Sequence, residues 1–122
     1  MLSSFALTLC FLVANASNPA CYQPTVERNR ILAEAQRNEF TVRRVEFVGL
    51  TYTRDRTLRN RMTPIINEGD VLTRDKLVRS LRGMSALKRV IYPLHLTDVV
   101  LRVDSQNGLV DMTICFRQRP RH

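Results

Sequence analysis

The residues that could do chemistry in this chain of 122 residues are few and scattered. Its histidines are His95 and His122, and His95 lies in an apolar run, where we expect a partly buried structural side chain rather than a catalytic one. No Cys and His spacing resembles a zinc site, and the four glycines are too isolated to form a phosphate-binding loop. Asp104 and Asp111 could lie near one another across a turn, where paired carboxylates are more often solvated than catalytic. We therefore expect no catalytic, cofactor or metal site and no enzyme activity.

The charge balance is basic, with 19 Lys and Arg against 11 Asp and Glu, a net charge of +8. Such a balance favours anionic partners, whether nucleic acid, lipid head groups or acidic envelope polymers. However, no basic run exceeds two residues, and no aromatic-rich strand lies beside the arginines. We favour a solvated basic surface and expect no nucleic-acid partner.

The first residues resemble an export segment. Leu2 to Ala14 carries no charge and is too short to span a bilayer as a helix, but it suits the core of a signal peptide. Ala14-Asn15-Ala16 matches a signal-peptidase site, so residues 1–16 are predicted to be a signal peptide. The alternative is a buried N-terminal helix of a cytosolic domain.

The cysteines are consistent with export. Cys10 would leave with the signal peptide, and Cys21 and Cys115 would remain in an oxidising compartment, where they could form a disulfide. Whether the two sulfurs meet is left open by the sequence. Lipidation of Cys21 is disfavoured, because Asn18 stands where a lipoprotein signal carries Leu.

Two regions follow the predicted signal peptide. Residues 17–40 are predicted to be a linker with a short helix, either a spacer or a docking helix, because their apolar residues form no strict stripe. Residues 41–119 are predicted to be the folded domain.

The folded domain begins with a strand at Thr41–Val48, which Gly49 ends. Thr53 is expected to cap a helix that presents Leu58, Met62 and Ile65 to the core and that Pro64 stops. After a Gly69-Asp70 turn, Thr73 is expected to cap a second helix over about 74–88, whose buried stripe would consist of Leu77, Leu81, Met84 and Leu87.

The C-terminal part reads as a hairpin. Strands over 97–104 and 109–117 flank Asn107-Gly108, a pair typical of tight turns. The predicted order is β-α-α-β-β, an α+β fold with a three-stranded mixed sheet and two helices packed on one face. Such a sheet has two edges whose backbone groups are unpaired.

Three motifs carry a family resemblance: V-E-F-V-G-L, the N-E-G-D turn and T-R-D-K-L, in this order between Val45 and Leu77. The chain resembles a POTRA (polypeptide-transport-associated) domain, a module that precedes the membrane barrel in outer-membrane assembly factors of the surface-antigen family. Because no barrel follows before His122, we expect either a lone module or a product truncated from a longer reading frame.

The resemblance implies a non-enzymatic module that is periplasmic or associated with the outer membrane. Its expected partners are unfolded or extended polypeptides, such as outer-membrane barrel proteins or assembly partners, bound by strand addition. The predicted contact strand is Thr97, Asp98, Val99, Val100, Leu101, Arg102 and Val103. Thr41–Val48 is the other candidate edge.

Two alternative functions remain. An envelope or division scaffold would use the same fold to dock one fixed partner. A basic nucleic-acid-binding domain is disfavoured, because Asn67-Glu68-Gly69-Asp70 is acidic where an RNA-binding module would carry a GxxG loop.

Overall fold

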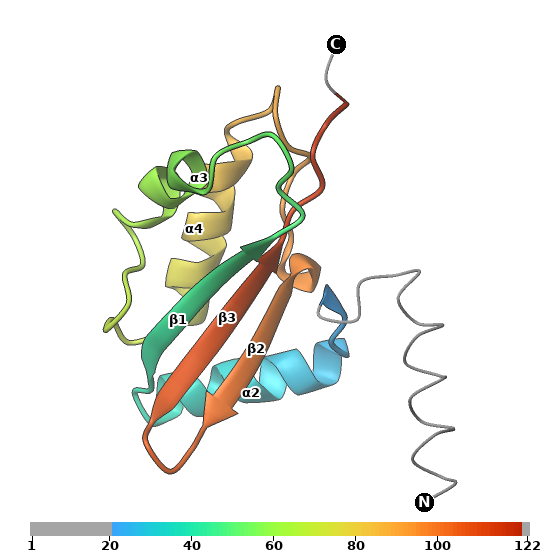
Figure 1. Ribbon diagram of the computed structural model, residues 1–122. Helices are drawn as coiled ribbons and strands as arrows, with labels where there is room; N and C mark the ends of the chain where they lie inside the picture. Colours follow the sequence, from blue (N-terminus) through green and yellow to red (C-terminus); the bar gives the residue numbers. More distant parts are fainter. Residues whose placement is uncertain (1–20, 121–122) are drawn as a thin grey trace, which may run out of the picture.

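The computed structural model describes residues 21–120, so the predicted signal peptide lies outside the described residues. The elements follow in the order α2 (Thr25–Arg37), β1 (Thr41–Val48), α3 (Asp55–Met62), α4 (Arg74–Ser85), η2 (Leu96–Asp98), β2 (Val99–Asp104) and β3 (Leu109–Cys115). Figure 1 shows the three strands side by side with the helices behind them.

The last strand lies in the middle of the sheet. β3 pairs in parallel with β1 and antiparallel with β2, which gives the order β1-β3-β2. The predicted mixed three-stranded α+β fold is therefore confirmed. Because β3 takes both partners, β1 and β2 are the two edge strands.

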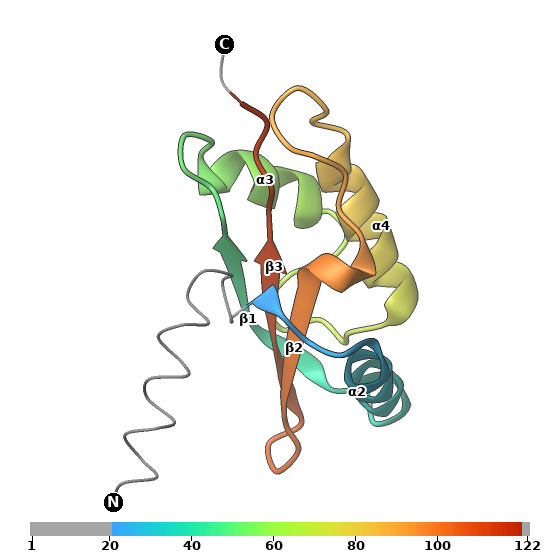
Figure 2. The same ribbon diagram turned by 90° about the vertical axis from the view of Figure 1, so that its right-hand side faces the viewer.

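The hydrophobic core lies between the sheet and the helices. α3 and α4 pack on one another, and Figure 2 shows α4 and α2 on the same side of the sheet. The core includes Val45, Leu101, Ile114, Leu58, Met62, Leu77, Leu81 and Met84. Of the two expected stripes, the residues within the helices face this core, whereas Ile65 and Leu87 lie beyond the ends of α3 and α4 and are partly buried against it.

Gly49 ends β1 for a steric reason. Its φ is +93°, and a side-chain carbon at this position would lie 2.2 Å from the carbonyl oxygen of Phe116. Only glycine allows both the positive φ and this close approach. The glycine of the V-E-F-V-G-L motif thus lets the chain leave β1 against the end of β3.

The predicted helix caps had different outcomes. Thr73 caps α4, where its hydroxyl accepts from the N–H of Lys76, as expected. Thr53 does not cap α3, which begins at Asp55 with Arg54 at the cap position, so this prediction was wrong. The reason is that the N–H of Thr53 donates to the side chain of Gln118, which holds Thr53 outside the helix.

Three element ends also differ from the prediction, one of them that of β3, which ends at Cys115 rather than at residue 117. α4 ends at Ser85 rather than near residue 88, because the Ser85 hydroxyl donates to the carbonyl of Leu81 and accepts from the N–H of Leu94. β2 begins at Val99 rather than at residue 97, because Leu96–Asp98 forms the 3-10 turn η2. His95 begins this turn with an exposed side chain, so the expectation of partial burial was wrong.

α2 belongs to the packed structure rather than standing outside it as a spacer. Ile31, Leu32 and Ala35 are core residues, and α2 contacts β2 and α4. These residues and Arg28 occupy one helical face at positions i, i+3, i+4 and i+7. A single charged residue on this face made the stripe hard to recognise in the sequence.

A disulfide joins Cys21 to Cys115, whose Cα atoms are 5.8 Å apart. Cys115 ends β3 and alternates with the core residues Ile114 and Phe116, so it lies on the sheet face opposite the helices. Residues 21–24 therefore lead from this open face, past β2, into α2 (Figure 2). We call residues 21–24 the strap.

Candidate functional site: the two sheet edges

The strap occupies the outer edge of β2. The side-chain amide of Gln23 donates to the carbonyl of Leu101 at 2.7 Å, and its oxygen accepts from the N–H of Leu101 at 2.8 Å. The two bonds reproduce what a neighbouring strand would offer at this position. Gln23 is only 9% exposed, so its amide forms these bonds away from water.

Arg28 completes the closure of this edge from α2. Its Nε donates to the carbonyl of Val99 and its Nη2 to the carbonyl of Gln23, both at 2.8 Å. The side chain is 2% exposed. Burial lowers the pKa of Arg28, an effect that the nearby charge of Asp98 opposes. Arg28 thus holds both the edge strand and the strap that covers it.

The edge of β1 is closed by the backbone of its own domain. The N–H of Val42 donates to the carbonyl of Asp70 at 2.8 Å, and the N–H of Gly69 donates to the carbonyl of Val42 at 2.7 Å. Gly69 has a φ of +97°, a conformation that glycine adopts readily. The Gly-Asp turn therefore closes the first half of this edge.

Arg59 covers the second half of the β1 edge. Its Nη2 donates to the carbonyl of Val45 at 2.6 Å, and its guanidinium lies 4.6 Å from the centre of the Phe47 ring. Asp55 forms an ion pair with Arg59 one helical turn earlier. This contact orients the guanidinium toward the strand.

Few outward backbone groups remain open on either edge within the described residues. Residues two apart in a strand direct their backbone groups to the same side, so Val103 points outward as Leu101 does. A groove of about 400 Å³ lies beside this position, between β2 and the strap, and is lined by residues that include Tyr22, Gln23, Ile31 and Val103. The β2 edge is thus continuous with an open groove.

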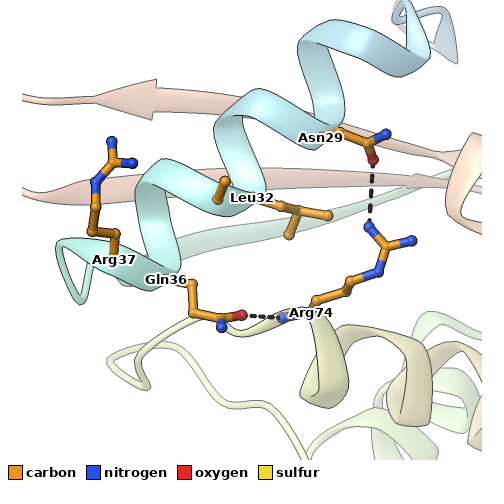
Figure 3. Close-up of a pocket in the computed structure, with 6 residues that line it drawn as sticks. Asn29, Leu32, Gln36, Arg37 and Arg74 are labelled. Carbon is orange, nitrogen blue, oxygen red and sulfur yellow. Dashed lines mark hydrogen bonds between the residues drawn. The ribbon is translucent and has the colours of Figure 1, made fainter.

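A second groove, of similar size, lies between α2 and α4 (Figure 3). Gln36 accepts from the N–H of Arg74 at 3.2 Å, and the Arg74 guanidinium reaches the side chain of Asn29 at 3.5 Å. These polar groups bond to one another across the groove. We therefore interpret it as the joint that fixes α2 beside α4.

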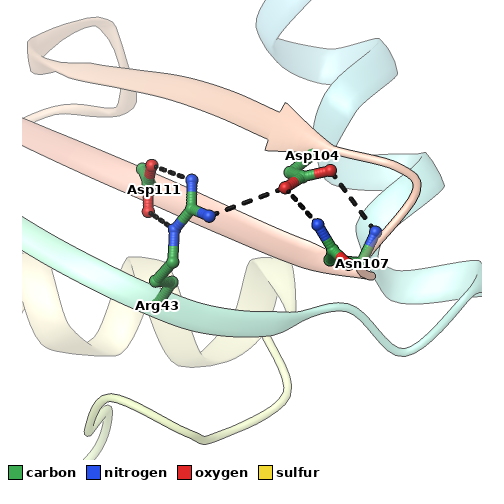
Figure 4. Close-up of polar contacts among 4 residues, drawn as sticks. All are labelled: Arg43, Asp104, Asn107 and Asp111. Carbon is green, nitrogen blue, oxygen red and sulfur yellow. Dashed lines mark hydrogen bonds and ion pairs between the residues drawn. The ribbon is translucent and has the colours of Figure 1, made fainter.

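The carboxylates of Asp104 and Asp111 do approach one another on the open face of the sheet, but Arg43 lies between them (Figure 4). Arg43 donates two bonds to Asp111, at 3.0 and 2.8 Å. Its hydrogen bond lowers the pKa of Asp111, and Asp111 in turn raises the pKa of Arg43. The amide of Asn107 lowers the pKa of Asp104. This cluster fastens the hairpin to β1.

The predicted contact residues fall into two parts. Thr97 and Asp98 lie in η2, whereas Val99 to Val103 lie in the edge strand β2. The residues that close the edges, Gln23, Arg28 and Arg59, were not singled out from the sequence. One signal in the sequence could have indicated such a residue. Arg28 is a charged residue on the same helical face as the apolar residues Ile31, Leu32 and Ala35.

Within residues 21–120, no group of three His, Cys, Asp or Glu side chains is placed to hold a metal ion. None of the helices in this part of the chain combines the length and the apolar character needed to cross a membrane.

The fold is that of a small α+β domain with a three-stranded mixed sheet. The family model described as surface antigen variable number repeat, POTRA, matches residues 40–114, more than half of the chain. The chain therefore belongs to the POTRA family, whose members are non-enzymatic interaction domains of envelope assembly and transport, typically periplasmic or associated with the outer membrane. No curated protein matches the chain.

Proposed function

We propose that this POTRA domain binds an extended polypeptide as an additional strand along the outer edge of β2. The observation that carries this proposal is the amide of Gln23, which already makes strand-like bonds to Leu101. An edge position that a side-chain amide fills so completely has the hydrogen-bonding geometry that a backbone peptide group needs.

The nature of the occupant favours β2 over β1. At β1, backbone groups of Gly69 and Asp70 bond to Val42, and an incoming strand would have to move the turn itself. At β2 the occupant of Leu101 is the side chain of Gln23 on the strap, whose displacement leaves the hydrogen bonds between the strands intact. Exchange of an amide for a peptide group replaces two hydrogen bonds by two equivalent bonds.

The binding expected from this edge is weak and reversible. With Gln23 displaced, Leu101 and Val103 together offer four outward backbone groups, while Arg28 keeps the carbonyl of Val99. Each bond contributes about 0.5–1.5 kcal/mol net. Backbone bonds discriminate little between side chains, which suits the transient holding of an unfolded or extended segment of an outer-membrane barrel protein or of an assembly partner.

The proposed location is the periplasm or the inner side of the outer membrane. The family supports this location, and so does the predicted signal peptide over residues 1–16. The Cys21–Cys115 disulfide is the kind of bond that persists in oxidising compartments.

The test is an amide-resolved NMR titration of the full chain with an extended peptide from a barrel strand. We expect shifts at Leu101, Arg102 and Val103, and tighter binding to Gln23→Ala. Gln106→Ala is the matched control, because it removes the same amide group from an exposed position in the hairpin turn. Equal binding by both variants, or shifts confined to β1, would contradict the proposal.

Two further ligands separate the alternative functions. A peptide N-methylated at every second residue, on the side that faces β2, should lose binding, while the peptide methylated on the opposite side should keep it. Short RNA should cause no shifts. Binding that survives both methylation patterns, or that RNA reproduces, would show that strand addition is not the mode of binding. Binding limited to a single peptide sequence would indicate a scaffold with one fixed partner.

A further inference from the structure

We infer that the Cys21–Cys115 disulfide is a redox latch that keeps the strap on the β2 edge, so that reduction opens the peptide site; this inference rests on the proposed function. The strap is anchored at both ends. At one end Cys21 is bonded to β3, and at the other Pro24 leads directly into α2. Gln23 lies between these anchors and faces Leu101.

The rest of α2 does not depend on the disulfide. Ile31, Leu32 and Ala35 are fully packed in the core, and Arg28 is held by the carbonyl of Val99. Loss of the disulfide therefore frees the end of the strap and leaves α2 in place. The freed segment keeps the contacts of Gln23, which are its amide bonds to Leu101 and the bond that its carbonyl accepts from Arg28, while the Tyr22 side chain is 75% exposed.

The effect of the latch is one of effective concentration. While the strap is tied at both ends, the Gln23 amide has little freedom to leave Leu101, and a peptide must compete with a neighbour that cannot diffuse away. With one end free, the amide must give up conformational freedom to return. The peptide then competes with a partner that is bound for a smaller fraction of the time.

The reaction that opens the latch is a thiol–disulfide exchange with a dithiol reductant. A thiolate of the reductant attacks the sulfur of Cys21, the less buried of the two, and Cys115 leaves as a thiolate that takes up a proton. The second thiol of the reductant then attacks the mixed disulfide and releases Cys21. Two thiols of the reductant become a disulfide, and the protein disulfide becomes two thiols.

The experiment compares oxidised and reduced full-length chain, with Cys10→Ser in both so that only Cys21 and Cys115 exchange. Amide hydrogen exchange is measured residue by residue, with dithiothreitol as the reductant. We expect the Leu101 amide to exchange about tenfold faster or more after reduction, because its N–H donates to the side chain of Gln23. The amides of Val100 and Arg102, which face β3, should keep their rates. Equal protection of Leu101 in both states would overturn the latch.

Peptide affinity is measured on the same samples. We expect reduced chain to bind the barrel-strand peptide about tenfold more tightly than oxidised chain. Gln23→Ala should bind tightly in both states, because the amide that occupies the backbone groups of Leu101 is absent whether or not the disulfide is formed. Cys21→Ala should behave as reduced chain without any reductant, and it leaves Cys115, the more buried of the two cysteines, unchanged.

The two proposals fail in different ways. If the peptide binds oxidised and reduced chain equally while Leu101 exchange is unchanged, the latch is wrong and strand addition survives. If no form binds the peptide, Gln23→Ala included, strand addition is wrong and the latch is judged by Leu101 exchange alone.

Discussion

The two edges of this sheet are closed by different means. At β1 the closing groups are backbone atoms of Gly69 and Asp70 over the first half and the side chain of Arg59 over the second, all within the part of the chain that the family model matches. At β2 they are the side chains of Gln23 and Arg28, which lie before residue 40, where the match begins. The β1 closure thus lies within the residues that the family model matches, and the β2 closure comes from residues that precede them.

The two kinds of closure differ in whether the edge can still bind another strand. An open edge invites pairing with other chains, and natural proteins cover their edges to prevent it. A backbone closure protects permanently, because it cannot open without unfolding the turn. A closure made by side chains on a tethered segment protects against chance pairing and still allows exchange for a suitable strand.

The largest expected effect tests the β2 closure through Arg28. Arg28→Met keeps the length of the side chain and leaves the carbonyls of Val99 and Gln23 without a donor, so unfolding should become easier by about 2–4 kcal/mol. Arg59→Met at the β1 edge removes a bond from a half-buried side chain and should cost less. Urea denaturation of both variants makes the comparison. A larger loss for Arg59→Met would reverse the ranking of the two edges.

The next effect concerns the amide of Gln23. Gln23→Ala exposes the N–H and carbonyl of Leu101 at the cost of two hydrogen bonds, and we expect a loss of about 2 kcal/mol in stability. Gln23→Glu keeps the acceptor but sets a carboxylate against the carbonyl of Leu101. Its stability relative to the parent should recover as the pH falls, because the protonated acid can donate again. Denaturation curves at neutral and acidic pH check this, and a pH-independent difference would argue against the proposed pairing.

The elements of the fold could be predicted because their signals are local. Each signal depends on residues that are close together in the sequence. These signals are the alternation of apolar and polar residues over 41–48 and 109–117, the apolar stripe of Leu77, Leu81 and Met84, and the Asn-Gly turn. Whether α2 is a spacer or a docking helix was left open by the sequence, because an arginine stands on its buried face. That arginine is buried with hydrogen bonds to two carbonyls, one of Gln23 nearby in the chain and one of Val99 on a distant strand. No local pattern records the bond to Val99.

The candidate site was only partly predictable for the same reason. That β2 would be an edge strand followed from the order of elements. The bond between Gln23 and Leu101 spans 78 positions in the chain and could not be read from either neighbourhood. The proximity of Cys21 and Cys115 likewise required the strap to cross the sheet edge, a path that only the three-dimensional structure reveals.

A smaller effect is expected at the turn that closes β1. Gly69→Ala places a side chain in open space, so its only cost is the positive φ, and we expect a loss of about 1 kcal/mol. Gly69→Asn should lose less, since Asn tolerates positive φ better than Ala does. Thermal unfolding of both variants measures this. The peptide affinity at β2 should not change, and a change there would show that the two edges are not independent.

The smallest effect is expected on the sheet face opposite the helices, where Arg43 of β1 bonds to Asp111 of the hairpin. The pKa of Asp111 is lowered by its hydrogen bond to Arg43, so the ionised carboxylate is favoured in the folded protein. This stabilising contribution is present above the ordinary carboxyl pKa of about 4 and is lost as the pH falls through the lowered value. Asp111→Asn should therefore be less stable than the parent at neutral pH, and the two should converge in acid. Urea midpoints across this range check the sign. Because β3 pairs with both edge strands, amide exchange should rise slightly and equally in β1 and β2; a rise in β1 alone would mean that Arg43 supports only its own strand.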